Sequence, residues 1–98
     1  MNLRAVDLNL LVALEALLRE RSVTKAAKAI GLTQPAMSNA LARLRDLLGD
    51  PLLVRSPDGM QPTPRAEALA GPLASVLGQI ETEVLRPEAF TQIGRAHV

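Results

Sequence analysis

The chain has 98 residues, which is room for one small domain, or for one domain and a connecting element. Its hydrophobic fraction of 48% is that of a globular protein, and its aromatic fraction of 1% excludes an all-β domain. The absence of cysteine excludes a disulfide scaffold, a cysteine zinc site and a thiol nucleophile. No apolar run spans a bilayer and no signal peptide is recognisable, so we expect a cytoplasmic protein without a membrane partner.

The formal net charge is only +1, but the basic residues are concentrated in the middle of the chain. Residues 21–65 carry seven lysines and arginines against three aspartates, a net charge of +4, whereas residues 1–20 carry −1 and residues 66–98 carry −2. An anionic partner is therefore expected to dock on the middle segment. Charge alone leaves nucleic-acid binding undecided, because lysine and arginine on helix faces are usually just solvated.

Periodic leucine and alanine residues predict three helices in the first half of the chain. The first is expected over residues 7–21, the second over 22–31 and the third over 33–49, and glycine ends the second and third. Pro35 fits the first turn of the third helix, where its missing N–H is not needed. The expected N-capping side chains are Asp7, Ser22 and Thr33.

Two short extended runs follow, Leu52–Arg55 and Met60–Pro62, separated by Pro57, Asp58 and Gly59. Proline presets φ, aspartate bonds back to the chain and glycine accepts positive φ, so these three residues predict a turn. We expect a small two-stranded hairpin, which we call the wing.

Thr63 and Pro64 predict the start of a last helix, whose apolar stripe continues to about Leu85. Pro72 is expected to kink this helix or to split it in two. The predicted fold class is all-α with a small β-hairpin wing. We expect residues 1–62 to form a winged helix-turn-helix domain, residues 63–87 a last helix that takes part in dimerisation, and residues 88–98 an irregular tail.

The chain offers little for catalysis. His97 is the only imidazole and lies in the tail, so neither a Ser-His-acid triad nor a histidine metal site can be assembled. The segment Ile93–Val98 back-translates into a common sequencing adapter, and we interpret it as non-native and the chain as the front end of a longer protein. We expect no enzyme, no cofactor and no metal.

The second and third helices, joined by a turn at Gly31, have the arrangement of a helix-turn-helix. Such a unit presents the first turn of its second helix to a major groove, where glutamine and asparagine can bond adenine edges. Arg43 and Arg45 lie farther along, nearer the phosphates. The candidate residues on this helix are Thr33, Gln34, Pro35, Ser38, Asn39, Ala42 and Arg43.

Two alternatives stay open at this point. Helix–glycine–helix corners are common in domains that never touch DNA, so Gln34 could simply face water and Arg55 could pair with Asp50 or Asp58. A hairpin directly after the third helix favours DNA binding, because a winged helix-turn-helix places its wing beside the groove.

The run SVTKAAKAIGLTQPAMSNALARLRDLLGDPLLVR from Ser22 to Arg55, followed by PTPRAEAL at Pro62–Leu69, resembles the N-terminal domain of LysR-type bacterial transcriptional regulators. The resemblance covers roughly residues 7–86 and implies a dimer that binds promoter DNA, with two linker helices packed antiparallel and an effector domain that is absent here. By position it implies groove-reading roles for Gln34, Pro35, Ser38 and Asn39. It also implies a wing contact for Arg55 and phosphate contacts for Ser22, Thr24 and Thr63.

The apolar stripe of the last helix is too long for one small core to cover, so we expect part of it to be the seam of a homodimer. The alternatives are that it folds back on the first helix, or that the chain is a helical protein–protein interaction module. The polar first turn and the charge of +4 favour DNA binding over such a module. We expect no small-molecule ligand for this segment. The stripe residues are Leu69, Leu73, Val76, Leu77, Ile80 and Val84.

Overall fold

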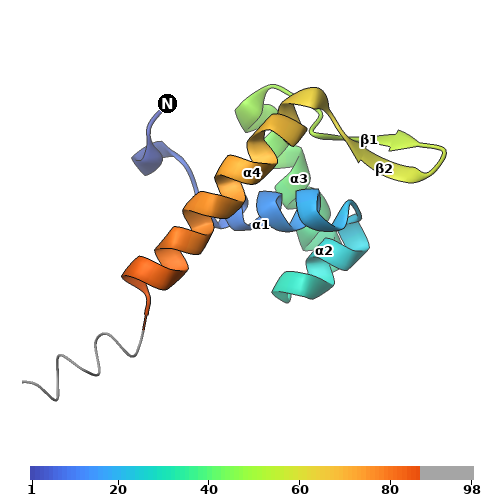
Figure 1. The fold of residues 1–98 in the computed structure, drawn as a ribbon. Coiled ribbons are helices and arrows are strands. Elements are labelled where there is room, and N and C mark those ends of the chain that lie inside the picture. The colour runs from blue at the N-terminus through green and yellow to red at the C-terminus, as the bar shows by residue number, and fades with distance from the viewer. Residues whose placement is uncertain (87–98) are drawn as a thin grey trace, which may run out of the picture.

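The computed structural model describes residues 1–86. Three helices form a cluster, the hairpin projects from it, and the last helix crosses α1 and extends away from the cluster (Figure 1). The predicted tail, with His97 and Ile93–Val98, lies outside the described residues. In chain order the elements are η1 (Leu3–Ala5), α1 (Leu8–Glu20), α2 (Val23–Ile30), α3 (Gln34–Leu48), β1 (Leu53–Ser56), β2 (Gly59–Pro62), α4 (Pro64–Gln79) and the π-helical turn η2 (Ile80–Val84).

The α-helices begin at the predicted capping residues. Each cap side chain accepts a backbone N–H of the first turn over 2.9–3.2 Å, which satisfies a donor that the helix itself cannot use. The prediction that α2 and α3 end at glycine is also confirmed, because Gly31 and Gly49 are left-handed. The caps are Asp7, Ser22, Thr33 and Thr63.

The core lies where α1, α2 and α3 meet, and residues after α3 close it. The predicted buried faces are confirmed, since Leu17 of α1 and Met37 and Leu44 of α3 are fully buried. Leu52 and Leu53, at the root of the wing, are fully buried as well. These two leucines thus anchor the hairpin to the core and fix its position.

The wing is an antiparallel pair in which Arg55 lies opposite Met60 and Ser56 opposite Gly59. Its first strand begins one residue later than predicted, at Leu53. Leu52 cannot continue the strand because its φ is +66°, in the left-handed region. That conformation directs the Leu52 side chain into the core, and burial of the leucine opposes the backbone strain.

Of the two outcomes expected for Pro72, a kink or a split, the split is wrong, because α4 runs without interruption from Pro64 to Gln79. Proline removes one backbone bond, and both Pro72 and Ala68, whose carbonyl loses its partner, lie on the exposed side where water can replace it. The irregularity lies instead in η2, where the Leu85 N–H donates to the Ile80 carbonyl, five residues earlier, over 3.0 Å.

Candidate nucleic-acid interface

A groove of about 720 Å³ separates the wing from the helix-turn-helix. Gln34 and Ser38 line it from the first turns of α3, Ser22 and Thr24 from the start of α2, and Arg55 from β1. Three separate parts of the chain therefore bring five predicted DNA-binding residues to one groove. All five are polar, as a surface that faces phosphates and base edges requires.

The other predicted residues on α3 lie on its outer face. Pro35, Asn39 and Ala42 are exposed, at helical spacing, and point away from the buried side of the helix. Their exposed face adjoins the groove side carried by Gln34 and Ser38. The first half of α3 thus presents a continuous polar and small-residue surface to solvent.

Gln34 and Ser38 are hydrogen-bonded to each other across one turn of α3. The Gln34 amide nitrogen Nε2 donates to the Ser38 hydroxyl over 3.2 Å, and both side chains are exposed. The bond occupies only one of the amide's donors and leaves the Gln34 carbonyl oxygen unbonded. The pair is therefore held in place with hydrogen-bonding capacity still directed outward.

Thr33 does not line the groove and caps α3 at the start of its exposed face, and Arg43 and Thr63 lie away from both the groove and that face. Arg43 lies on the far flank of α3, where it lines a small hollow with Val6 and Asp46. The Thr63 hydroxyl is hydrogen-bonded within the protein. It accepts the Ala66 N–H over 3.1 Å and donates to Asp50 Oδ2 over 2.6 Å.

Arg21 and Arg45 also line the groove, although the sequence reasoning gave them no groove contact. The guanidinium of Arg45, predicted to lie near phosphates, donates through Nε to the Pro51 carbonyl and through Nη2 to the Leu53 carbonyl. A signal for Arg45 existed in its helical spacing, because positions 34, 38 and 45 fall on one flank of α3.

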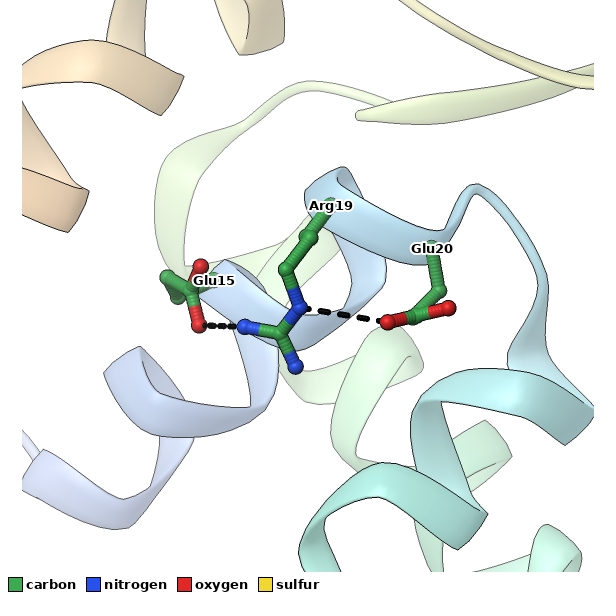
Figure 2. A network of polar contacts seen from close by, with 3 residues as sticks. All are labelled: Glu15, Arg19 and Glu20. Carbon is green, nitrogen blue, oxygen red and sulfur yellow. Dashed lines mark hydrogen bonds and ion pairs between the residues drawn. The ribbon is translucent and has the colours of Figure 1, made fainter.

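Ion pairing distinguishes Arg19 from the arginine of the wing. Within residues 1–86 the ion pairs are those of Arg19, which contacts both Glu15 and Glu20 on α1 (Figure 2). These contacts, that with Glu15 first, raise the pKa of Arg19. The alternative that Arg55 pairs with Asp50 or Asp58 is wrong, so the Arg55 charge remains available to an anion in the groove.

The residues of the apolar stripe of α4 differ in exposure. Leu69, Leu73 and Leu77 are half-buried, whereas Val76, Ile80 and Val84 are 53%, 40% and 72% exposed. The half-burial of Leu69, Leu73 and Leu77 agrees with the alternative that α4 folds back on α1, which it contacts. An apolar hollow of about 270 Å³ also opens between α4 and the rest of the domain. It is lined by Leu11, Leu14, Leu48, Leu69, Pro72, Leu73 and Val76.

The extra residue in the π-helical turn changes which side chain continues the stripe. Leu85, five residues after Ile80, lines a second hollow together with Ile80 and Val12. Val84, predicted to be the next stripe residue, does not line it.

In the part of the chain that the structure describes, no helix has both the length and the apolarity to cross a bilayer.

Residues 8–67 match the family model described as "Bacterial regulatory helix-turn-helix protein, lysR family". The chain belongs to the LysR family. The matched residues begin at α1 and end in the first turn of α4, so they include both the helix-turn-helix and the wing. The family resemblance and the fold class predicted from the sequence are therefore confirmed.

Relatives and solved structures of the LysR family agree with this assignment. The HTH-type transcriptional regulator SyrM 2 of Sinorhizobium fredii is 61% identical over 79 residues, which are 81% of this chain and 23% of that protein. The crystal structure of the probable transcriptional regulator PA0477 from Pseudomonas aeruginosa has a TM-score of 0.79 and 45% identity, covering 87% of this chain and 29% of that one. The crystal structure of BenM_DBD in complex with catB site 1 DNA has a TM-score of 0.76 and 26% identity, and the match covers 91% of this chain and 97% of that one. The chain spans about a quarter of the length of the curated relatives it matches.

Proposed function

We propose that this domain binds double-stranded promoter DNA sequence-specifically and acts as a LysR-type transcription regulator in the bacterial cytoplasm. The observation that carries the proposal is the groove, where the polar first turns of α3 face the unpaired guanidinium of Arg55 on the wing. A helix that reads base edges and a wing that contacts the backbone need this arrangement. The complex of BenM_DBD with DNA supports it, because that domain is similar over nearly its whole length.

Within this proposal the residues divide by the part of DNA they meet. Arg55 and the start of α2 contact phosphates, since a helix N-terminus and a guanidinium both attract anions. The Thr33 hydroxyl accepts the N–H that caps α3, and the residue is exposed at the start of the helix, where we place it near a phosphate. The proposed readers are Gln34, Pro35, Ser38, Asn39 and Ala42, and the proposed phosphate contacts are Ser22, Thr24, Thr33 and Arg55. The internal bonds of Thr63 and the far-flank position of Arg43 keep these two residues out of the proposed set.

We further propose that the exposed residues of the α4 stripe, Val76, Ile80 and Val84, form the seam of a homodimer. Val76 and Ile80 are large apolar side chains left in water by this fold, and a two-fold partner would cover both copies of the same patch. The half-buried stripe residues Leu69, Leu73 and Leu77 support α4 from within the domain.

The protein–protein interaction module is not favoured. Such a module does not need an unpaired arginine opposite a polar helix turn, and the family match covers the helix-turn-helix and the wing rather than most of α4. The proposal assigns neither catalysis nor a small-molecule ligand to this domain, and places any response to an inducer outside it.

A mobility-shift titration tests the function directly. The chain is titrated against a duplex from its own upstream region and against a random duplex of equal length, each at two salt concentrations. We expect tighter binding to the upstream duplex and a fall of affinity with salt for both, since phosphate contacts release counterions. Equal affinity for the two duplexes would contradict sequence-specific recognition.

A further inference from the structure

The wing is attached to the domain mainly at its root. Leu53 is fully buried and Met60 is half-buried, but Val54 and Arg55 are exposed along with both residues of the turn. A two-stranded hairpin is marginally stable by itself, so its direction depends on what holds its first residues. The root is therefore the place where the orientation of Arg55 is decided.

Arg45 holds this root through two hydrogen bonds. Its Nε donates to the Pro51 carbonyl over 2.8 Å, and its Nη2 donates to the Leu53 carbonyl over 2.9 Å. The two carbonyls lie on either side of Leu52, the residue with a left-handed backbone. A planar guanidinium fixes the direction of both bonds to the two carbonyls, whereas the freely rotating ammonium of a lysine imposes no such direction.

The hydrogen bond from Arg45 to the Leu53 carbonyl also affects Arg55, which lies in the same strand. Leu53 and Arg55 are two residues apart in β1, so their side chains leave the strand on the same side. Fixing the Leu53 carbonyl from α3 therefore also fixes the side to which Arg55 points. Arg45 and Arg55 line the same groove, but two of the Arg45 donors, on Nε and Nη2, are used within the protein.

Asp50 secures the other end of the same short segment. Its Oδ2 accepts the Leu52 N–H over 2.8 Å and the Thr63 hydroxyl over 2.6 Å. With Asp50 on one side and Arg45 on the other, the left-handed Leu52 is held from two directions, as a strained residue requires.

We propose that Arg45 is a positioning residue of the DNA-binding site, which aims Arg55 at the phosphate backbone and does not itself bind DNA. The inference rests on the proposed function, because it assigns a task within that groove. It predicts that Arg45 and Arg55 act as one unit on DNA affinity.

A double-mutant cycle tests this unit. Arg45→Ala should weaken binding to random DNA by about the same factor as Arg55→Ala, and should lower the salt slope by about one per subunit. In the double variant the loss should stay near that of Arg55→Ala alone, because a misdirected Arg55 is already ineffective. Multiplying losses in the double variant would instead mean that Arg45 contacts DNA on its own, and would overturn the proposal.

Arg45→Lys keeps the charge but loses the rigid planar bridge between the two carbonyls. A direct phosphate contact would survive this change with the salt slope unaltered, whereas a positioning role predicts a slope as low as that of Arg45→Ala. Melting curves recorded beside the titrations show whether each variant is folded. Arg45→Lys is the less disruptive change, and a wild-type salt slope in this variant would overturn the proposal even if Arg45→Ala did not fold.

Arg65→Ala is the matched control. Arg65 also donates to a carbonyl at the end of α3, that of Leu48, but it comes from α4 and its hydrogen bond does not involve the wing. The factor by which Arg65→Ala lowers DNA affinity, whatever its size, should multiply with the factor for Arg55→Ala in the double variant. Failure of the proposed function is distinguishable, since the wild-type chain itself would then bind the two duplexes equally or bind neither.

Discussion

The Thr63 hydroxyl donates a hydrogen bond to Asp50 Oδ2 over 2.6 Å, and so links the first turn of α4 to the segment before the wing. The same hydroxyl oxygen accepts the Ala66 N–H, and the same carboxylate oxygen accepts the Leu52 N–H. A single pair of side chains thus caps a helix, holds a left-handed residue and joins two parts of the domain.

Acid should weaken this link. The Thr63 hydroxyl first, and the Leu52 N–H second, lower the pKa of Asp50 below its ordinary value of 3.8. Because the folded pKa is the lower one, the carboxylate contributes stability above about pH 4, and this contribution is lost as the pH falls from there toward the folded pKa. Thermal melting between pH 6 and pH 3 should show a steeper loss for the wild type than for Asp50→Asn. Asp58→Asn, in the exposed turn, serves as the control, and parallel curves for wild type and Asp50→Asn would contradict the prediction.

Gln34→Ala should separate sequence reading from general affinity. An amide that contacts a base edge contributes about 1–3 kcal/mol on the specific duplex and nothing on random DNA. The salt slope should stay unchanged, because no charge is removed. Ser38→Ala, which removes the partner of Gln34 within α3, should have a smaller effect of the same kind. Equal weakening on both duplexes in a mobility-shift titration would show that Gln34 has no reading role.

Arg55→Ala should have the opposite signature. Loss of a phosphate contact weakens specific and random binding alike and lowers the salt slope by about one per subunit. Titrations at four or more salt concentrations measure the slope. An unchanged slope would mean that the Arg55 guanidinium meets no phosphate, although no ion pair holds it within the described residues.

Ile80→Glu should disrupt the proposed dimer. Two-fold symmetry would place two unpaired carboxylates in one apolar seam, which should raise the dissociation constant by about a hundredfold or more. Leu32→Glu is a matched control, since Leu32 and Ile80 are both 40% exposed but Leu32 lies in the turn between α2 and α3. Sedimentation of the variants measures dimerisation, and an Ile80→Glu dimer as tight as the wild type would place the seam elsewhere.

Two left-handed residues should respond to glycine with opposite signs. Arg21 and Leu52 have φ values of +53° and +66°, a conformation that costs about 1–2 kcal/mol in a residue with a Cβ. Arg21 is exposed, so Arg21→Gly should stabilise the domain by up to about 1 kcal/mol. Leu52 is fully buried, and losing its side chain costs about 2–5 kcal/mol, so Leu52→Gly should destabilise it. Urea unfolding measures both, and a stabilised Leu52→Gly would show that strain outweighs burial there.

Local signals in the sequence were sufficient for the helices and for part of the site. A capping side chain such as Ser22 or Thr63 acts within its own first turn, so a short stretch of sequence contains the whole signal. The groove residues Gln34 and Arg55 were also predictable, from their positions in a helix-turn-helix and a wing. Long-range contacts were not, because the partners of Arg45 depend on how the segment after α3 folds back.

Backbone exceptions were equally inaccessible. Leu52 has no local feature that favours positive φ, and only the core that receives its side chain explains it. Pro72 gives a strong local signal for a break, yet α4 continues through it. The solvent-exposed side of α4 tolerates the lost bond, and exposure is a property of the folded domain rather than of the dipeptide.

The π-helical turn Ile80–Val84 is the last element that the structure describes, and it would shift the phase of any helix that continued α4 beyond it. One residue added to an α-helix rotates everything after it by about 100° around the axis and advances it by about 1.5 Å. Any module joined to this end through a continuous helix therefore has its azimuth relative to the DNA-facing side determined by this single turn. Deleting one residue between Ile80 and Val84 would restore regular winding and turn that module by roughly a quarter of a revolution. Chimaeric regulators joined just before and just after this turn are accordingly expected to differ in geometry, even when the fused sequences are identical.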